Sequence, residues 1–111
     1  MESYFKELNI AITVSDKEGN VLWMNNRSQE VNHGDFTGKN LLDCHPEPAK
    51  TKLIEMLKQH STNAYTIEKN GVKKLIYQTP WFDNSCFAGY VELSIEIPFE
   101  MPHYIRQPKA K

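Results

Sequence analysis

The dipeptide Asn70-Gly71 constrains the fold more than any other feature of this sequence. It lies within residues 65–77, where larger apolar and polar residues alternate on both sides of it. A type I′ turn needs positive φ at both central residues, and Asn-Gly tolerates this well. A two-residue loop places Glu68 opposite Lys73, which is a pair of opposite charge. The sequence therefore predicts an antiparallel hairpin with a defined register.

Three further segments are predicted to be strands of an antiparallel sheet. Residues 10–14 alternate between larger and smaller side chains, and residues 21–24 follow them after turn residues at 16–20. The final strand is expected at residues 86–97, after a turn at 83–85.

This final strand has two chemically different sides. Its apolar side carries Val91, Leu93, Ile95 and Ile97. Its polar side carries Glu92, Ser94 and Glu96. We expect the apolar side to be the core and the polar side to face away from it, as in an antiparallel sheet covered by helices on one side.

The helices are predicted to be short, with one exception. The main helix is expected over residues 47–60, because proline is tolerated in a first helical turn and Pro46-Glu47-Pro48 opens the segment. Its apolar stripe consists of Ala49, Leu53, Ile54, Met56 and Leu57. Shorter helices are expected at 2–8, within 38–44, and up to Val31, the last capped by Asn26 or Ser28.

Two strands, several short helices and three strands follow one another in an order that resembles a PAS domain. Local motifs add to the resemblance: an entry hairpin, a glycine-led segment before the later helices, a variant found in some bacterial PAS domains, and a closing strand. In this sequence they are Asp16-x-x-Gly19-x-Val21 with Met24-Asn25, Gly38-Lys39-Asn40-Leu41-Leu42, Asp43-Cys44-His45-Pro46, and Gly89-Tyr90-Val91 through Ile95-Glu96-Ile97.

The resemblance implies an α+β fold, a five-stranded antiparallel sheet with short helices packed on one face. It divides the chain into a lead-in segment at 1–8, a PAS-like domain at 9–98 and a tail at 99–111. It also implies a signalling role, a small-molecule ligand held between sheet and helices, and a homodimer.

Composition excludes several other classes of function. Thirteen basic and fourteen acidic residues give a net charge of −1, so we expect no nucleic-acid partner. No segment approaches the ~20 apolar residues of a membrane span, and the N-terminus lacks the apolar run of a signal peptide, so we expect no membrane partner. Cys44 and Cys86 form no CxxC pair and are read as reduced thiols of a cytoplasmic protein.

Eight residues are predicted to line the ligand cavity: Trp23, Phe36, Cys44, His45, Leu53, Leu57, Tyr77 and Tyr90. Most are apolar or aromatic, which is typical of small-molecule sites. An aromatic pair after Pro80, Trp81-Phe82, is a candidate protein contact.

His45 and Cys44 each allow a chemical and a structural interpretation. His45 is a candidate axial haem ligand, or a histidine that orders the Pro46 turn by hydrogen bonding. Cys44 is a candidate redox thiol, activated by a helix N-terminus, or a buried inert one. The Asn-Cys-Arg-Phe motif of light-sensing flavin PAS domains is missing, because Asn40 is followed by Leu-Leu-Asp-Cys.

No catalytic or metal site is predicted. The sequence contains no G-x-S-x-G, phosphate loop or H-E-x-x-H motif, so we expect no enzyme. The possible metal ligands Asp43, Cys44, His45 and Glu47 are too close together in sequence to enclose an ion without help from His33 or His60.

Three functions remain open. The first is a small-molecule sensor in which the ligand, of unknown identity, shifts the main helix or a dimer interface. The second is a protein-interaction or dimerisation module with a filled core. The third is a haem- or thiol-based redox sensor that uses His45 and Cys44.

The segment after the final strand bears on how such a domain would signal. Pro98 and Pro102 prevent a continuous signalling helix there. If the chain is complete, we expect it to act by association with a separate partner. The apolar tail at 98–104 is expected to pack on the domain, to pack on a second copy, or to fray.

Overall fold

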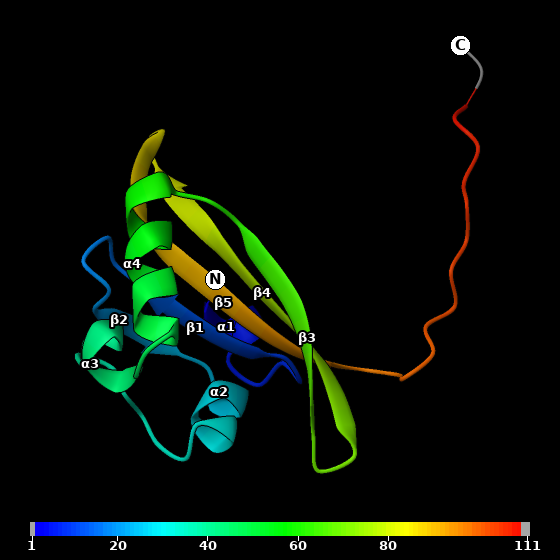
Figure 1. The fold of residues 1–111 in the computed structure, drawn as a ribbon, viewed down its shortest axis with the longest axis horizontal. Helices are drawn as coiled ribbons and strands as arrows, with labels where there is room; N and C mark the ends of the chain where they lie inside the picture. The colour runs from blue at the N-terminus through cyan, green and yellow to red at the C-terminus, as the bar shows by residue number, and fades with distance from the viewer. Residues whose placement is uncertain (1, 110–111) are drawn as a thin grey trace.

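Five strands form one antiparallel sheet in the order β2-β1-β5-β4-β3, so the last strand of the chain lies at the centre of the sheet (Figure 1). The structure is a computed structural model and describes residues 2–109. The strands are β1 (Ala11–Ser15), β2 (Val21–Met24), β3 (Asn63–Lys69), β4 (Val72–Asp83) and β5 (Cys86–Ile97). The helices are α1 (Glu2–Phe5), α2 (Asn26–Val31), α3 (Leu41–Cys44) and α4 (Ala49–Gln59). The predicted α+β class with a five-stranded antiparallel sheet is confirmed.

The hairpin formed by β3 and β4 has the predicted register. Asn70 and Gly71 both have positive φ, 53° and 75°, and Glu68 pairs with Lys73. Strand β4 extends beyond the predicted end at Tyr77, and it carries Pro80 next to an irregularity in its pairing with β5. Proline is tolerated in a strand at such a place, so it does not end β4.

The helices begin and end close to their predicted limits, with physical reasons for each difference. Helix α4 starts at Ala49 rather than 47, and His60 ends it in a left-handed conformation with φ of 55°. His60 then stacks on Phe87 of β5, with 3.7 Å between the ring centroids. The cap of α2 is Asn25, not Asn26 or Ser28 as predicted.

Asn25 joins four segments of the chain. Its side chain is fully buried, and Oδ1 accepts hydrogen bonds from the backbone nitrogens of Ile12 (2.9 Å) and Ser28 (3.0 Å). Its Nδ2 donates to the carbonyl oxygens of Phe5 (2.9 Å) and Ile10 (2.7 Å). The amide thus caps α2 and ties the segment after α1 to the sheet, with every polar atom satisfied.

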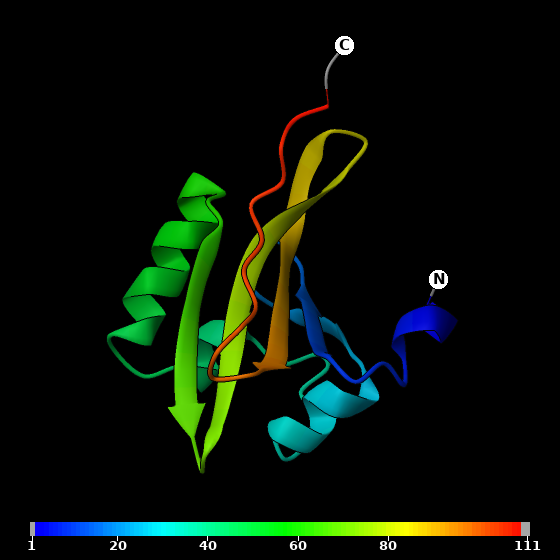
Figure 2. The same ribbon diagram turned by 90° about the vertical axis from the view of Figure 1, so that its right-hand side faces the viewer.

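Helices α2, α3 and α4 cover one face of the sheet, which we call the inner face, while α1 lies on the opposite, outer face (Figure 2). The prediction of which side of β5 is covered was wrong. Glu92 and Ser94 line hollows beneath the helices, whereas Val91 and Leu93 line a hollow of the outer face together with Phe5 of α1. Strand alternation defines two faces, but it does not say which one the helices will cover.

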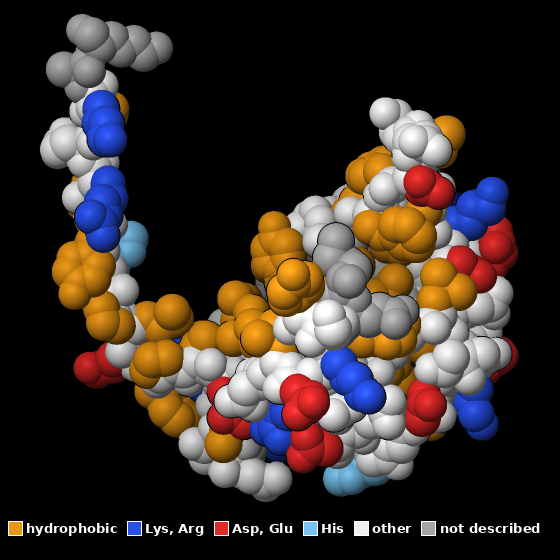
Figure 3. Space-filling model, turned by 180° about the vertical axis from the view of Figure 1, so that it is seen from behind, with side chains coloured by type: hydrophobic (Ala, Val, Ile, Leu, Met, Phe, Trp, Pro, Cys, Tyr) orange, Lys and Arg blue, Asp and Glu red, His pale blue; other side chains and the backbone are white. Residues whose placement is uncertain are grey.

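The outer face is apolar and open. Hydrophobic side chains gather over it in Figure 3. They border a shallow hollow of about 630 Å³ lined by Phe5, Ile12, Val14, Trp23, Trp81, Val91 and Leu93. Trp81 is fixed there, because its Nε1 donates a hydrogen bond of 2.9 Å to the carbonyl oxygen of Ser15.

The tail after β5 runs away from the sheet (Figures 1 and 3). Phe99, Met101, Tyr104 and Ile105 are between 52% and 82% exposed, so the tail does not pack back on the domain. Packing on a second copy stays a prediction. None of the helices within residues 2–109 has the length and apolar character needed to cross a membrane.

Candidate ligand cavity

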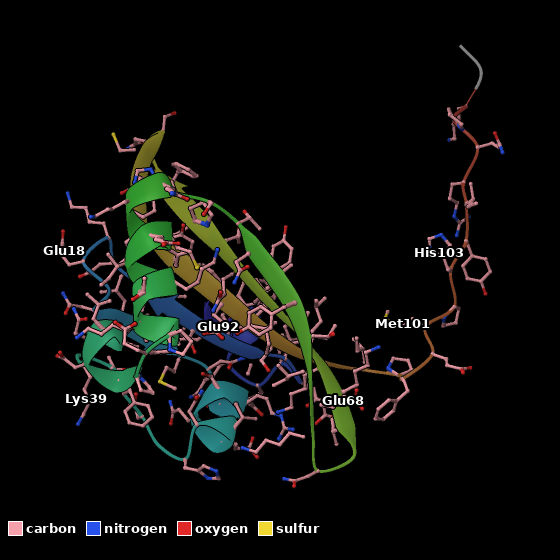
Figure 4. The ribbon with its side chains drawn as sticks, in the orientation of Figure 1. Glu18, Lys39, Glu68, Glu92, Met101 and His103 are labelled. Atoms are coloured by element: carbon pink, nitrogen blue, oxygen red, sulfur yellow. The ribbon has the colours of Figure 1, made fainter. Side chains whose placement is uncertain are left out.

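A cavity of about 320 Å³ separates the inner face of the sheet from α2 and α3. Its lining combines apolar and polar side chains: Thr13, Val21, Met24, Asn32, Phe36, Leu41, Cys44, His45 and Glu92. Three smaller hollows adjoin it beneath the helices, and Glu92 lines all four. Figure 4 labels the Glu92 side chain. The space between sheet and helices is therefore not completely filled by side chains.

A polar row crosses the inner face of the sheet, beneath the cavity and two of the adjoining hollows. The strand register aligns Thr13 of β1, Glu92 of β5, Gln78 of β4 and Asn63 of β3. Thr13 Oγ1 shares a hydrogen bond of 2.6 Å with the Ser28 hydroxyl of α2, and Asn63 Nδ2 donates to Gln78 Oε1 at 3.0 Å. Glu92 thus occupies the centre of the row, on the central strand.

Glu92 is a carboxyl group in a poorly solvated place. Burial raises the pKa of Glu92 above its usual range, while the charge of His45 and a hydrogen bond from Gln78 lower it by less. Burial and then the charge of Glu92 also raise the pKa of Tyr65, which lines an adjoining hollow. Within residues 2–109, no basic side chain lies within the 4.0 Å of an ion pair with Glu92.

His45 stands at the end of α3, where its ring is held by one hydrogen bond. Nδ1 lies 2.8 Å from the carbonyl oxygen of Leu41. A carbonyl oxygen can only accept, so Nδ1 carries the hydrogen, and Nε2 of the neutral ring is an acceptor. The bond ties His45 to α3 rather than to the Pro46 turn.

Cys44 is the last residue of α3 and is exposed at the edge of the cavity. It is therefore neither the buried thiol nor the thiol at a helix N-terminus that the sequence predicts. Cys86, the other free thiol, is exposed at the start of β5.

The structure separates the eight predicted cavity residues into three groups. Phe36, Cys44 and His45 line the main cavity, and Leu53 and Tyr90 line the small hollow beside it. The hydroxyl of Tyr90 lies 2.6 and 2.7 Å from the carbonyl oxygens of Met56 and Ser61, so it fastens the end of α4 to β5.

The remaining three predicted residues lie elsewhere. Leu57 faces the turn at Gly19. Trp23 lines the hollow of the outer face, and Tyr77 pairs with Leu93, so its side chain is on that face too. Trp23 and Tyr77 share one reason for being misplaced: the aromatic residues of β2 and β4 alternate with the residues that face the helices.

Six residues of the main cavity are missing from the eight predicted ones: Thr13, Val21, Met24, Asn32, Leu41 and Glu92. A signal for Glu92 exists in the strand pairing, because polar Thr13 and Gln78 flank it once the register is known. Asn32 follows α2 and carries no local signal of its own.

The lining fits a small polar molecule better than it fits a haem. His45 Nε2 is available to a ligand, but the cavity is at the lower end of small-molecule pockets and contains a carboxylate where a macrocycle needs apolar contacts. Among the described residues, no three His, Cys, Asp or Glu side chains are arranged to hold a metal ion.

Several solved structures have a similar fold. The PAS domain of BvgS from Bordetella pertussis is 19% identical, with a TM-score of 0.66, and the match covers 88% of this chain and 84% of that one. A sensory box sensor histidine kinase from Vibrio cholerae is 12% identical, with a TM-score of 0.65 and 89% and 90% covered. The Aer2 receptor of Vibrio cholerae, described as a dual PAS-heme oxygen sensor, is 14% identical, with a TM-score of 0.56 and 80% and 95% covered.

No protein-family model matches the sequence, and no curated protein matches it. The structural matches nevertheless extend over most of both chains, at identities too low to show more than a common fold. The chain has a PAS-like fold, as its sequence predicts.

Proposed function

We propose that this chain is a signalling sensor domain that binds a small polar molecule in the cavity centred on Glu92. The observation that carries the proposal is an unfilled space between sheet and helices with a carboxyl group on its floor. A protein whose only need was a stable core would fill this space with apolar side chains, because a buried carboxyl group destabilises the fold. The sensory roles of the structurally similar domains support it.

The geometry offers a way to turn occupancy into a signal. Helix α3 forms the cavity wall, while the far end of α4 is fastened to β5 by Tyr90. A ligand that contacts Glu92 and the α3 wall together favours one position of α3. It shifts the equilibrium by the difference in its affinity for the two positions. No catalytic step is involved, and the role is binding alone.

The test is a compound screen read by native mass spectrometry, with the cavity filled by substitution. Leu41→Trp adds bulk to the cavity wall, and Leu22→Trp makes the same change at an exposed position of β2. We expect a compound bound by the wild-type chain to be lost by the Leu41 variant and kept by the Leu22 variant. Equal binding to all three proteins would place the ligand outside the cavity and refute the proposal.

The outer face favours a second function, self-association. Its hollow is lined only by uncharged side chains, so two copies can bring this face together without burying a charge. A stable contact needs about 800 Å² from each partner. We expect a dimer by light scattering that Leu93→Glu dissociates and Leu22→Glu does not. A monomer at all concentrations would refute it.

We also propose a cytoplasmic location. Cys44 and Cys86 are both free and exposed, which suits a compartment that keeps thiols reduced. Fractionation of cells that express the tagged chain would test this, and recovery from a non-cytoplasmic fraction would contradict it.

A further inference from the structure

We infer that the ligand of this cavity is a small organic cation, an amine or ammonium group carried on a short apolar chain. The inference rests on the proposed function and adds the ligand's chemical class. It follows from the hydrogen-bonding atoms that the lining side chains leave unused and from where the charges lie.

Asn32 presents an acceptor to the cavity because its donor is already occupied. Its Nδ2 donates to the carbonyl oxygen of Ser28 at 2.9 Å and lies 3.3 Å from the Ser28 hydroxyl oxygen. A carbonyl oxygen cannot donate, so the amide orientation is determined. Its Oδ1 has no partner within residues 2–109 and is available as an acceptor.

His45 presents a second acceptor for a related reason. Its Nδ1–H is held by the carbonyl oxygen of Leu41, which leaves Nε2 with a lone pair while the ring is neutral. Asn32 follows α2 and His45 follows α3, so the two acceptors approach the cavity from different elements.

Glu92 supplies the third acceptor group and the only carboxylate of this lining. Gln78 donates one hydrogen bond to it, and the Thr13 hydroxyl shares a hydrogen bond with Ser28. A lining with acceptors and a negative charge suits a ligand that only donates. An alkylammonium group has three N–H donors and no acceptor, whereas a carboxylate or phosphate would meet like charge and unpaired acceptors.

The remaining lining residues define the rest of the ligand. Four of them are apolar and belong to β2, the segment before α3, and α3 itself: Val21, Met24, Phe36 and Leu41. They suit an alkyl or aryl chain, and Phe36 adds a ring to which a cation is attracted.

His45 is the basic side chain of the main cavity, and three lysines lie at the adjoining hollows. Lys52 lines the hollow beneath α4, and Lys69 and Lys74 line the one beneath the β3–β4 hairpin. None of them forms an ion pair with Glu92 in the described part of the chain. No lysine or arginine of the described residues therefore fills the cation position next to Glu92, and His45 leaves it open while its ring is neutral.

The experiment compares three four-carbon probes that differ mainly in charge: butylammonium, 1-butanol and butyrate. Binding is measured by amide chemical shifts of the cavity residues in the full chain. We expect butylammonium to bind, butanol to bind less, and butyrate not to bind. Glu92→Gln should weaken butylammonium by about ten- to a hundred-fold, because a hydrogen bond to a charged group is lost.

Matched variants keep the test decisive. Glu68→Gln makes the same change on an exposed position of β3 and should leave butylammonium binding unchanged. Asn32→Ala removes a second acceptor and leaves the carboxylate in place, so it should weaken butylammonium binding by less than Glu92→Gln does. This variant keeps the test usable if the Glu92 variant does not fold. Equal binding of butanol, stronger binding of butyrate, or insensitivity to both cavity variants would overturn the inference.

The two proposals fail differently. If none of the three probes shifts the cavity amides but another compound binds and is lost with Leu41→Trp, the cation inference is wrong and the sensor proposal stands. If no compound responds to Leu41→Trp, both are wrong.

Discussion

Replacing Asn25 by alanine removes four hydrogen bonds at once from a fully buried position. Each hydrogen bond contributes about 0.5–1.5 kcal/mol net, so the expected loss is about 2–6 kcal/mol of unfolding free energy. The helix cap alone accounts for roughly 1 kcal/mol of this. A domain of this size has only about 5–15 kcal/mol in total, so the variant should be close to unfolding.

Urea denaturation followed by tryptophan fluorescence measures this loss, with Asn26→Ala as the matched control. Asn26 is exposed, and its side chain makes no hydrogen bond among the described residues, so its variant should stay within about 0.5 kcal/mol of wild type. A loss below about 1 kcal/mol for Asn25→Ala, similar to that of the control, would refute the view that this amide joins the N-terminal segment, β1 and α2.

Asn25→Asp refines the test by changing one end of the amide. Oδ1 can still accept from Ile12 and Ser28, but the second oxygen now faces the carbonyl oxygens of Phe5 and Ile10. Burial disfavours the ionised form and raises its folded-state pKa above the unfolded value. The stability difference from wild type should therefore shrink as the pH falls, and a difference independent of pH would contradict this.

Three further predictions concern β5. Because the folded-state pKa of Glu92 is raised, the unfolding free energy of wild type should fall relative to that of Glu92→Gln as the pH rises from below the ordinary value of 4.5, and should stop falling above the folded-state pKa. Urea melts at a series of pH values measure this, and a rise of the wild-type value relative to the variant with increasing pH would contradict the assignment. Gly89→Ala places a Cβ against the Ser15 carbonyl oxygen and should lower the unfolding free energy by roughly 3 kcal/mol or more, whereas Gly38→Ala, with open space around it, should lower it by about 1 kcal/mol. Thermal unfolding measures both, and equal shifts of the melting temperature would contradict the prediction. Tyr90→Phe should lower the unfolding free energy by about 1 kcal/mol and speed amide hydrogen exchange at the end of α4. An unchanged exchange rate there would refute the role of the Tyr90 hydroxyl.

The parts of the fold that follow from local chemistry could be predicted from the sequence. Asn70-Gly71 determines a turn and a register by itself, and the residues around Asn84 mark the start of β5 in the same way. The exact ends of α4 could not be predicted in this way, because its caps Pro48 and His60 depend on contacts with distant residues, such as the stacking of His60 on Phe87.

The site depended on contacts that are distant in sequence. Alternation in β5 separates Glu92 from Val91 and Leu93, yet only the positions of α2, α3 and α4 decide which side is enclosed. A glutamate on an alternating strand ordinarily faces water, so Glu92 was assigned to solvent. The same wrong assignment of the two faces led to the prediction that Trp23 and Tyr77 line the cavity, whereas both lie on the outer face.

Glu92 and its two neighbours on β5 lie in different surroundings although they are consecutive in the chain. The carboxyl group faces the cavity beneath the helices, and the side chains of Val91 and Leu93 face the open apolar side. The sheet is thus one backbone thick, and side chains of its central strand line both the inner cavity and the outer hollow. A tilt or twist of β5 would move side chains on both faces, so a change inside the domain would reach its exterior without any route around the edge of the sheet.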